Sequence, residues 1–113
     1  MKVLTPAEWI GDALPTLVLI PGGTGDSGDF TSNPQKIHRF LEDGYALILF
    51  DPDGRGKSGG IEDDNGFIHQ DGLAAVVKYA AELQQVDAGR IGMVSYSYGI
   101  TMAAGVLARY PDL

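Results

Sequence analysis

Cysteine is absent from this 113-residue sequence, and basic side chains are few. Without cysteine the chain has no disulfide framework and no thiolate metal site, and no metal or organic cofactor is expected. Eight lysines and arginines stand against fifteen aspartates and glutamates, for a net charge of −7. This balance excludes the basic surface that nucleic-acid phosphates require, so nucleic acid is not expected as a partner.

Long apolar runs are also missing. No segment approaches the roughly 20 apolar residues that span a bilayer, so no membrane association is expected. Residues 1–11 hold one lysine and no long apolar run, which is not typical of a signal peptide, and we expect a cytoplasmic protein. The composition, 44% hydrophobic and 20% charged, is ordinary for a globular protein. The length suits one domain over residues 1–113.

Three short apolar segments indicate the strands of a sheet. Each is nearly continuous in apolar residues, as strands are when helices cover both faces of a parallel sheet. The segments are Leu17–Ile20, Ala46–Phe50 and Ile91–Val94. Residues 1–15 form a poorly defined lead-in, in which a strand is not favoured.

Helical patterns separate these strands. The first helix is expected from Asn33-Pro34 to Gly44, because an asparagine cap followed by proline starts a helix and glycine ends one. The second is expected from about Asp71 to Gln85, and the third begins just after Ser97. Four residues are expected to face inward on the third helix: Ile100, Ala103, Ala104 and Leu107. Strands and helices therefore alternate three times along the chain. This order predicts an α/β fold with a mainly parallel sheet, a three-layer sandwich of about three strands and three helices.

The loop after the third strand holds the main candidate for chemistry. Residues 95–99 read S-Y-S-Y-G, close to the nucleophile elbow G-x-S-x-G, which holds its serine in a sharp strand-to-helix turn. The turn requires small residues two before and two after the serine, which Ser95 and Gly99 provide. The alternative is a serine that only caps a helix. The flanking strand and helix favour the elbow, with Ser97 as the nucleophile.

A glycine-rich loop follows the first strand. In an acyl-transfer site this loop supplies one backbone N–H of an oxyanion hole, here from Gly23 or Thr24. The residue after the nucleophile, Tyr98, supplies the other. Such donors bind the negative charge that develops on the carbonyl oxygen.

The same loop permits a different interpretation. Gly23, Gly25 and Gly28 match the G-x-G-x-x-G spacing of a phosphate-binding loop. A dinucleotide site needs its helix to open within the glycine run, whereas the next helix is expected only near Asn33. A small nucleotide- or phosphate-binding domain is therefore the less favoured alternative.

The loop after the second strand reads D-x-x-G-x-G-x-S from Asp51 to Ser58. Gly56-Lys57-Ser58 suggests a Walker A motif, but Asp51 stands where that motif requires glycine. Asp51 is expected to bind backbone N–H groups in the loop, and catalysis by Asp51 or Asp53 is not expected. The acidic run 62–64 is expected to be a solvated loop.

Together, the glycine-rich loop, the D-x-x-G-x-G-x-S loop and the serine elbow resemble the α/β-hydrolase superfamily over about Thr16 to Leu113. The stretch Arg90–Gly99 is most similar to the dienelactone-hydrolase, prolyl-oligopeptidase and cocaine-esterase-like branches, which often carry a tyrosine beside the nucleophile. Two positions depart from the usual pattern. Pro21 replaces a common histidine and Ser95 replaces a common glycine.

The resemblance implies a serine hydrolase, esterase- or peptidase-like, in which Ser97 attacks a small-molecule ester or amide. Tyr96 and His69 are further candidates for the pocket. His69 is expected just before the second helix, at the same sheet edge as Ser97, where it has a small chance of acting as base. His38, the other histidine, is expected to be a partly exposed packing residue.

The resemblance also implies an incomplete catalytic site. In this superfamily the acid and the histidine of the triad follow the serine, whereas the sequence ends at Leu113. We therefore expect an N-terminal, truncated hydrolase core with little activity by itself. Both neighbours of the first strand are expected to be open edges, covered by a missing C-terminal half, a partner chain or a second copy. A non-catalytic interaction module that pairs through these edges is the remaining alternative.

Overall fold

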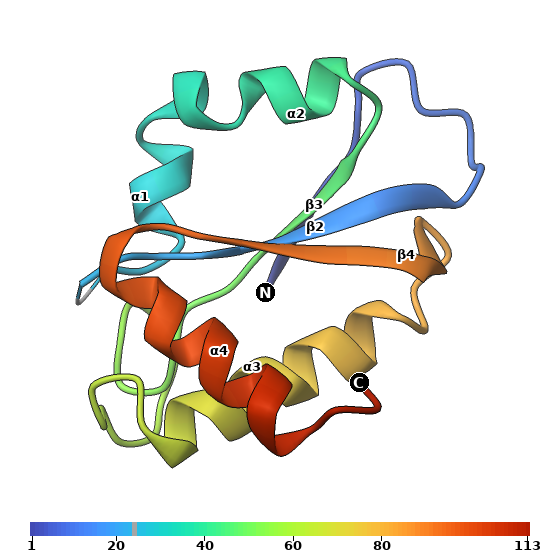
Figure 1. Cartoon of the computed structure of the whole chain (residues 1–113). Coiled ribbons are helices and arrows are strands. Elements are labelled where there is room, and N and C mark those ends of the chain that lie inside the picture. Colours follow the sequence, from blue (N-terminus) through green and yellow to red (C-terminus); the bar gives the residue numbers. More distant parts are fainter. Residues whose placement is uncertain (24) are drawn as a thin grey trace.

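A four-stranded sheet forms the centre of the molecule, in a computed structural model that describes residues 1–23 and 25–113 (Figure 1). The strand order is β1-β3-β2-β4. Strand β2 pairs in parallel with β3 on one side and with β4 on the other, and β1 pairs antiparallel with β3. The strands are β1 (Lys2–Leu4), β2 (Leu14–Ile20), β3 (Ala46–Leu49) and β4 (Val86–Ser95).

The three expected strands are confirmed, but the lead-in contains a fourth. Strand β1 pairs Lys2 with Leu49 and Leu4 with Leu47, so it covers the outer edge of β3. The expectation that both neighbours of β2 are open edges was therefore wrong. Of the two neighbours of β2, only β4 keeps an unpaired edge among the described residues, and β1 forms the other end of the sheet. A three-residue strand is too short to show a period in the sequence, and its pairing depends on β3.

Helices cover both faces of the sheet (Figure 1). One face carries the short elements, and the other carries the two long helices. The short elements are α1 (Gly28–Thr31), the 3₁₀ turn η1 (Pro34–Lys36) and α2 (His38–Glu42). The long helices are α3 (Phe67–Ala80) and α4 (Ile100–Arg109), the latter preceded by the 3₁₀ turn η2 (Ser97–Gly99).

The first and second helices differ from expectation. The first is broken into α1, η1 and α2. Helix α3 begins at Phe67, earlier than expected, because the Asp63 carboxylate accepts hydrogen bonds from the N–H groups of Gly66, Ile68 and His69 (3.1, 2.6 and 3.2 Å). A carboxylate on the first free N–H groups stabilises a helix start. His69 therefore lies inside the first turn of α3.

Two apolar clusters fill the space between the layers. Successive residues of β2 point to opposite faces, so Val18 and Ile20 join the cluster under α3 and α4, while Leu19 joins the cluster under α1 and α2. Both clusters contain fully buried side chains. This confirms the predicted three-layer α/β architecture.

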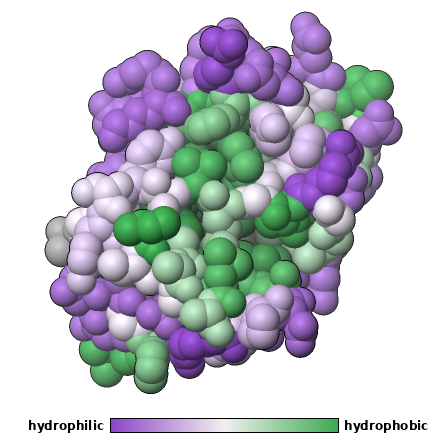
Figure 2. All heavy atoms as spheres, in the orientation of Figure 1, coloured by the Kyte–Doolittle hydropathy of each residue, from purple (hydrophilic) through white to green (hydrophobic). Residues whose placement is uncertain are grey.

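Helix α4 is rotated by one residue from its expected position. Its buried residues are Met102, Ala103 and Val106, whereas Ile100 and Leu107 are each 56% exposed. Apolar residues surround much of this helix, so the sequence period fits either phase. Figure 2 shows an apolar surface across the middle of this face of the molecule.

Candidate active site

Ser97 occupies the tip of the turn between β4 and α4. Its φ is +51°, a left-handed conformation that only three non-glycine residues adopt in the described chain. The residue before it, Tyr96, is extended, with φ −113° and ψ 129°. The turn closes with a hydrogen bond from the Gly99 N–H to the Tyr96 carbonyl (2.9 Å), and Ser97 is exposed. A serine held in this conformation is strained by about 1–2 kcal/mol.

The glycine-rich loop packs directly against this turn. A Cβ atom on Gly99 would lie 2.6 Å from the Pro21 carbonyl oxygen. A Cβ atom on Gly22 would lie 2.6 Å from the Tyr96 carbonyl oxygen and 3.1 Å from the Ser97 Cβ atom. Backbone therefore meets backbone here, which explains the glycine at both positions. The structure brings the first and third loops together, as the sequence predicts.

Several backbone N–H groups near Ser97 are without an acceptor within the described part of the chain. Those of Gly23 and Tyr98 are among them. A Gly25 N–H to Gly22 carbonyl hydrogen bond (2.9 Å) closes a tight turn around Gly23, whose φ is +54° and which faces open space. Thr24, the other expected donor, lies outside the described residues.

Asp51 ties the second loop to the first. Its carboxylate accepts hydrogen bonds from the Lys57 N–H (2.9 Å), as the sequence predicts, and from the Ser27 N–H (2.8 Å). Burial alone would raise the pKa of Asp51, but these hydrogen bonds outweigh burial and hold its pKa below the ordinary value. The ionised Asp51 carboxylate thus connects the two loops through hydrogen bonds.

The glycine loop is a poor phosphate site, although not for the reason that the sequence suggested. Helix α1 begins at Gly28, within the glycine run. However, the N–H groups there bind carboxylates of the chain itself: Gly28 donates to Asp26 (2.7 Å) and Ser27 to Asp51. A phosphate would meet negative charge at this place.

A buried polar cluster beneath the loops was not predicted. Arg55 is 5% exposed and binds Glu62 through both Nε and Nη2 (2.5 and 3.1 Å). The Arg55 guanidinium lowers the pKa of Glu62 to about 2. The acidic run 62–64 lies in a loop with Glu62 and Asp64 exposed, as expected, but Glu62 also pairs with Arg55 and Asp63 caps α3. In the sequence, the one sign of this buried cluster was the position of Arg55 between two glycines.

Asn65 belongs to the same cluster and reaches the elbow. Its Nδ2 donates to the Tyr98 carbonyl and to Thr101 Oγ1 (both 3.0 Å). Its Oδ1 accepts a hydrogen bond from Arg55 Nη2 (3.2 Å), and Arg55 Nη1 also contacts the Gly25 carbonyl (3.4 Å). The cluster therefore joins all three loops.

Comparison with known proteins identifies the family. The family profile described as the alpha/beta hydrolase fold matches residues 15–113. This chain belongs to the α/β-hydrolase fold family. No curated protein matches the hydrolase chain significantly.

Solved hydrolase structures share the fold of this chain. The α/β hydrolase GrgF from Penicillium sp. sh18 superimposes with a TM-score of 0.77 at 21% identity, over 94% of this chain and 35% of that protein. XC6422 from Xanthomonas campestris, an α/β serine hydrolase without a lid, gives 0.71 at 18%, over 96% and 50%. An α/β serine hydrolase homologue from Coxiella burnetii gives 0.70 at 21%, over 96% and 50%. The chain thus spans at most half the length of these proteins.

Neither histidine of this hydrolase chain is hydrogen-bonded to Ser97 in the described structure. The His69 side chain is fully buried: its Nδ1 accepts from the Asn65 N–H (2.9 Å) and its Nε2 lies 2.8 Å from the Asp53 carbonyl oxygen. Both ring nitrogens are occupied, so the structure does not support His69 as a base or a pocket residue. His38 Nε2 lies 2.6 Å from Glu42 Oε1 on the exposed side of α2.

The two tyrosines beside Ser97 lie in different surroundings. Tyr96 packs its ring against Phe30, with centroids 5.3 Å apart, and burial raises the pKa of its hydroxyl. Its ring thus belongs to the cluster under α1 and α2. The Tyr98 side chain is 47% exposed.

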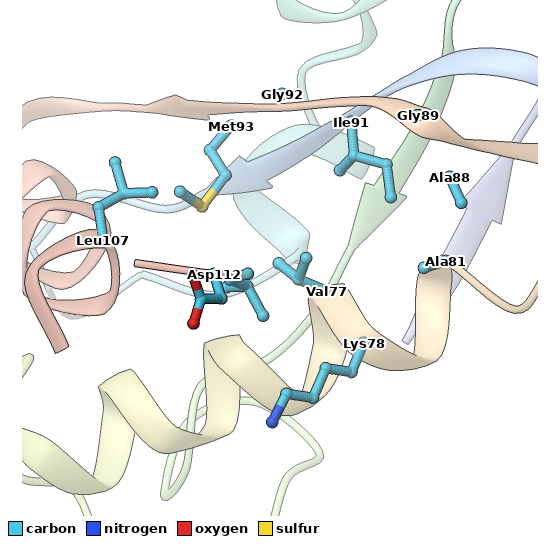
Figure 3. A pocket seen from close by; sticks show the side chains of 11 residues that line it. Val77, Lys78, Ala81, Ala88, Gly89, Ile91, Gly92, Met93, Leu107 and Asp112 are labelled. Atoms are coloured by element: carbon cyan, nitrogen blue, oxygen red, sulfur yellow. The ribbon is translucent and has the colours of Figure 1, made fainter. Parts of the chain in front are cut away.

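One cavity of the chain lies away from Ser97. It measures about 600 Å³ and opens along the unpaired edge of β4, between α3 and the end of α4 (Figure 3). Its walls are largely apolar, and the apolar side chains that line it include Val77, Ile91, Met93, Leu107 and Leu113. Within residues 1–23 and 25–113 no helix is long and apolar enough to cross a membrane, and no group of side chains is suited to hold a metal ion.

Proposed function

We propose that this chain carries the nucleophile of a serine hydrolase, and that Ser97 attacks an ester or amide carbonyl. The positive φ of Ser97 at an exposed strand-to-helix tip is the observation that supports this most. Glycine would adopt the same conformation without strain, so a hydroxyl retained there suggests a use for the hydroxyl. Ser97 also faces a neighbouring loop with an unpaired N–H group, as acyl transfer requires.

In this proposal the N–H groups of Tyr98 and Gly23 bind the oxyanion of the tetrahedral intermediate. Both are without an acceptor in the described chain, and both lie in segments that pack against each other around Ser97. The N-terminal end of α4 adds a favourable partial positive charge beneath the serine. Thr24 stays a candidate for the donor from the glycine-rich loop, as an alternative to Gly23.

The proton of the Ser97 hydroxyl needs a base, which we propose comes from outside these residues. His69 is buried with both nitrogens occupied, and His38 is paired with Glu42. Similar solved structures are two to three times longer than this chain, which leaves room for a histidine and an acid. Residues 1–113 alone are then expected to show little more than the weak catalysis of an oxyanion hole. The dienelactone-hydrolase, prolyl-oligopeptidase or cocaine-esterase-like branch stays a prediction.

The unpaired β4 edge favours a second proposal about partners. An exposed edge beside an apolar cavity is a template for another strand, so we propose that further polypeptide, from the same or another chain, covers it. If that pairing were the whole function, the chain would be a non-catalytic interaction module. Reactivity at Ser97 distinguishes the two.

A covalent probe tests the catalytic proposal. The protein encoded by the whole reading frame that contains this sequence would be treated with a fluorophosphonate and analysed by mass spectrometry. We expect one adduct on Ser97, absent from the Ser97→Ala variant, together with hydrolysis of a p-nitrophenyl ester. Circular dichroism would confirm that both proteins are folded.

Three outcomes would count against the proposal. A folded protein that forms no adduct would favour the interaction module. An adduct that persists in Ser97→Ala would place the reactive group elsewhere. A reading frame without a later acidic residue and histidine would remove the proposed base.

A further inference from the structure

A buried asparagine in the segment before α3 reaches the serine turn, and we infer that Asn65 positions the Ser97 elbow. The inference rests on the proposed role of Ser97 as nucleophile. Asn65 is 3% exposed and lies far from the elbow in the sequence. Its φ is +66°, in the left-handed region where asparagine is among the best-tolerated side chains.

Every polar atom of Asn65 is used. Its N–H donates to His69 Nδ1 (2.9 Å), and its carbonyl accepts from Gln70 Nε2 (3.1 Å), so the backbone of Asn65 is fixed against α3. The side chain is then directed by Arg55, which donates to Oδ1 (3.2 Å). This leaves the two Nδ2 protons for the elbow. A buried group with all its hydrogen bonds made is rigid.

The Tyr98 carbonyl and Thr101 Oγ1 accept the two hydrogen bonds that Asn65 Nδ2 donates. The Thr101 hydroxyl also donates to the Tyr98 carbonyl (2.8 Å), so two donors hold one oxygen. That oxygen belongs to the same residue whose N–H is a proposed oxyanion donor. A rotation of Tyr98 that released its carbonyl would therefore also move the proposed donor.

Asn65 is also the sole side chain from outside η2 and α4 that hydrogen-bonds to residues 95–101, as far as residues 1–23 and 25–113 show. On the strand side of the turn, the Tyr96 N–H donates to the Ile20 carbonyl (3.2 Å), while Gly22 and Gly99 approach backbone closely and limit the space. A strained residue such as Ser97 persists only where its surroundings determine its conformation. Asn65 supplies the directional part of that requirement on the helix side of Ser97.

Arg55 extends the same control to the second proposed donor. Its Nη2 holds Asn65, while its Nη1 contacts the carbonyl of Gly25, at the end of the turn that contains Gly23. One arginine–asparagine pair thus connects the two loops that carry the proposed amide donors. Displacements of about 1 Å in such a site cost up to a hundredfold in rate.

The test uses Asn65→Asp, which keeps the side-chain shape, tolerates a positive φ and retains the acceptor for Arg55, but removes both Nδ2 donors. The matched control is Glu62→Gln, which removes the charge but keeps an acceptor for Arg55 Nε, so the hydrogen bond from Arg55 to Asn65 stays in place. Thr101→Val removes the second donor to the Tyr98 carbonyl and serves if Asn65→Asp does not fold. All variants would be made in the product of the whole reading frame.

Two readouts separate positioning from stability. The first is the amide ¹H–¹⁵N shift of Tyr98 and Gly99. The second is the fluorophosphonate reaction, split into its maximal rate constant and its half-saturating probe concentration. In Asn65→Asp we expect shifted elbow amides with unchanged core amides, and a maximal rate constant lower by roughly tenfold to a hundredfold at an unchanged half-saturating concentration. Thr101→Val should give a smaller loss of the same kind, and Glu62→Gln should lower urea stability without either effect.

A folded Asn65→Asp protein with wild-type elbow amides and a wild-type labelling rate would overturn the inference. Equal effects in Asn65→Asp and Glu62→Gln would also overturn it, because they would indicate general loosening. If the wild-type protein is not labelled, the proposed function fails. The amide shifts still decide whether Asn65 holds the elbow.

Discussion

The loop after β3 and the turn after β4 both leave the same edge of the sheet with sharply bent backbone, yet they place the strain on different residues. In residues 51–60 of the loop after β3, the Asp51 loop, the positive φ values belong to glycines: Gly54 (+77°), Gly56 (+54°) and Gly60 (+92°). Further along, Asp64 and Asn65 also have positive φ, but these two residue types tolerate it better than serine. In the elbow the positive φ belongs to Ser97. Glycine accepts this conformation at little cost and serine does not.

The difference separates structure from chemistry. The Asp51 loop needs a backbone shape, and glycine supplies it while Asp51 holds the loop by its carboxylate. The elbow needs the same kind of shape together with a side chain at its tip. Strain is therefore relieved where only the path of the chain matters, and is kept where an exposed hydroxyl is presented.

The largest expected effect is on the structural loop. A Cβ atom on Gly54 would lie 2.6 Å from the Glu62 backbone nitrogen, and its φ of +77° would add strain. Gly54→Ala is expected to lower the free energy of unfolding by about 3 kcal/mol, measured by urea denaturation. Gly59→Ala is the matched control, since its Cβ would meet nothing within 4 Å, and it should change stability by less than about 0.5 kcal/mol. Equal losses in both variants would contradict the glycine argument.

A smaller effect is expected at the elbow, with the opposite preference. Ser97→Gly should be more stable than Ser97→Ala by about 1 kcal/mol, because glycine removes the left-handed strain and alanine keeps it. Neither variant should react with a fluorophosphonate. Thermal and urea unfolding of the two proteins would measure the strain directly. An alanine variant at least as stable as the glycine variant would mean that the turn is unstrained.

The smallest effect concerns pH and the pair that links the loops. Arg55 lowers the pKa of Glu62 to about 2 in the folded chain, below its ordinary value of 4.5. The stability from this pair is thus complete above about pH 4.5 and is lost as the pH falls toward about 2. Glu62→Gln should lose stability near neutral pH and show a flatter decline between pH 5 and about 2 in urea titrations. An unchanged pH profile would show that the pair contributes nothing.

Much of the fold could be predicted because buried parallel strands are continuous in apolar residues. The same reasoning failed where neighbours decide the outcome. Strand β1 is three residues long and exists through its pairing with β3. Helix α3 starts at Phe67 because Asp63 caps it, although its acidic run had every mark of a solvated loop. The phase of α4 was ambiguous because apolar residues lie on most of its sides.

The site divides in the same way. Ser97 and Gly99 follow a local pattern of small residues around a turn, so the sequence alone predicts the sharp turn that the structure has at Ser97. Arg55 and Asn65 do not, since charged and amide side chains are usually exposed and nothing local indicates that they meet underneath the loops. A local sequence pattern does not predict contacts between segments that are distant in the sequence.

The close approach of Gly22 to the elbow also limits how this chain could be altered by directed evolution. Any side chain at position 22 would collide with the Tyr96 carbonyl, so libraries that randomise this position would contain few folded members. Tyr98, with its exposed side chain, is a better place for diversity. On the Gly22 side, then, a molecule held at Ser97 would always meet main chain, whatever sequence is selected around it.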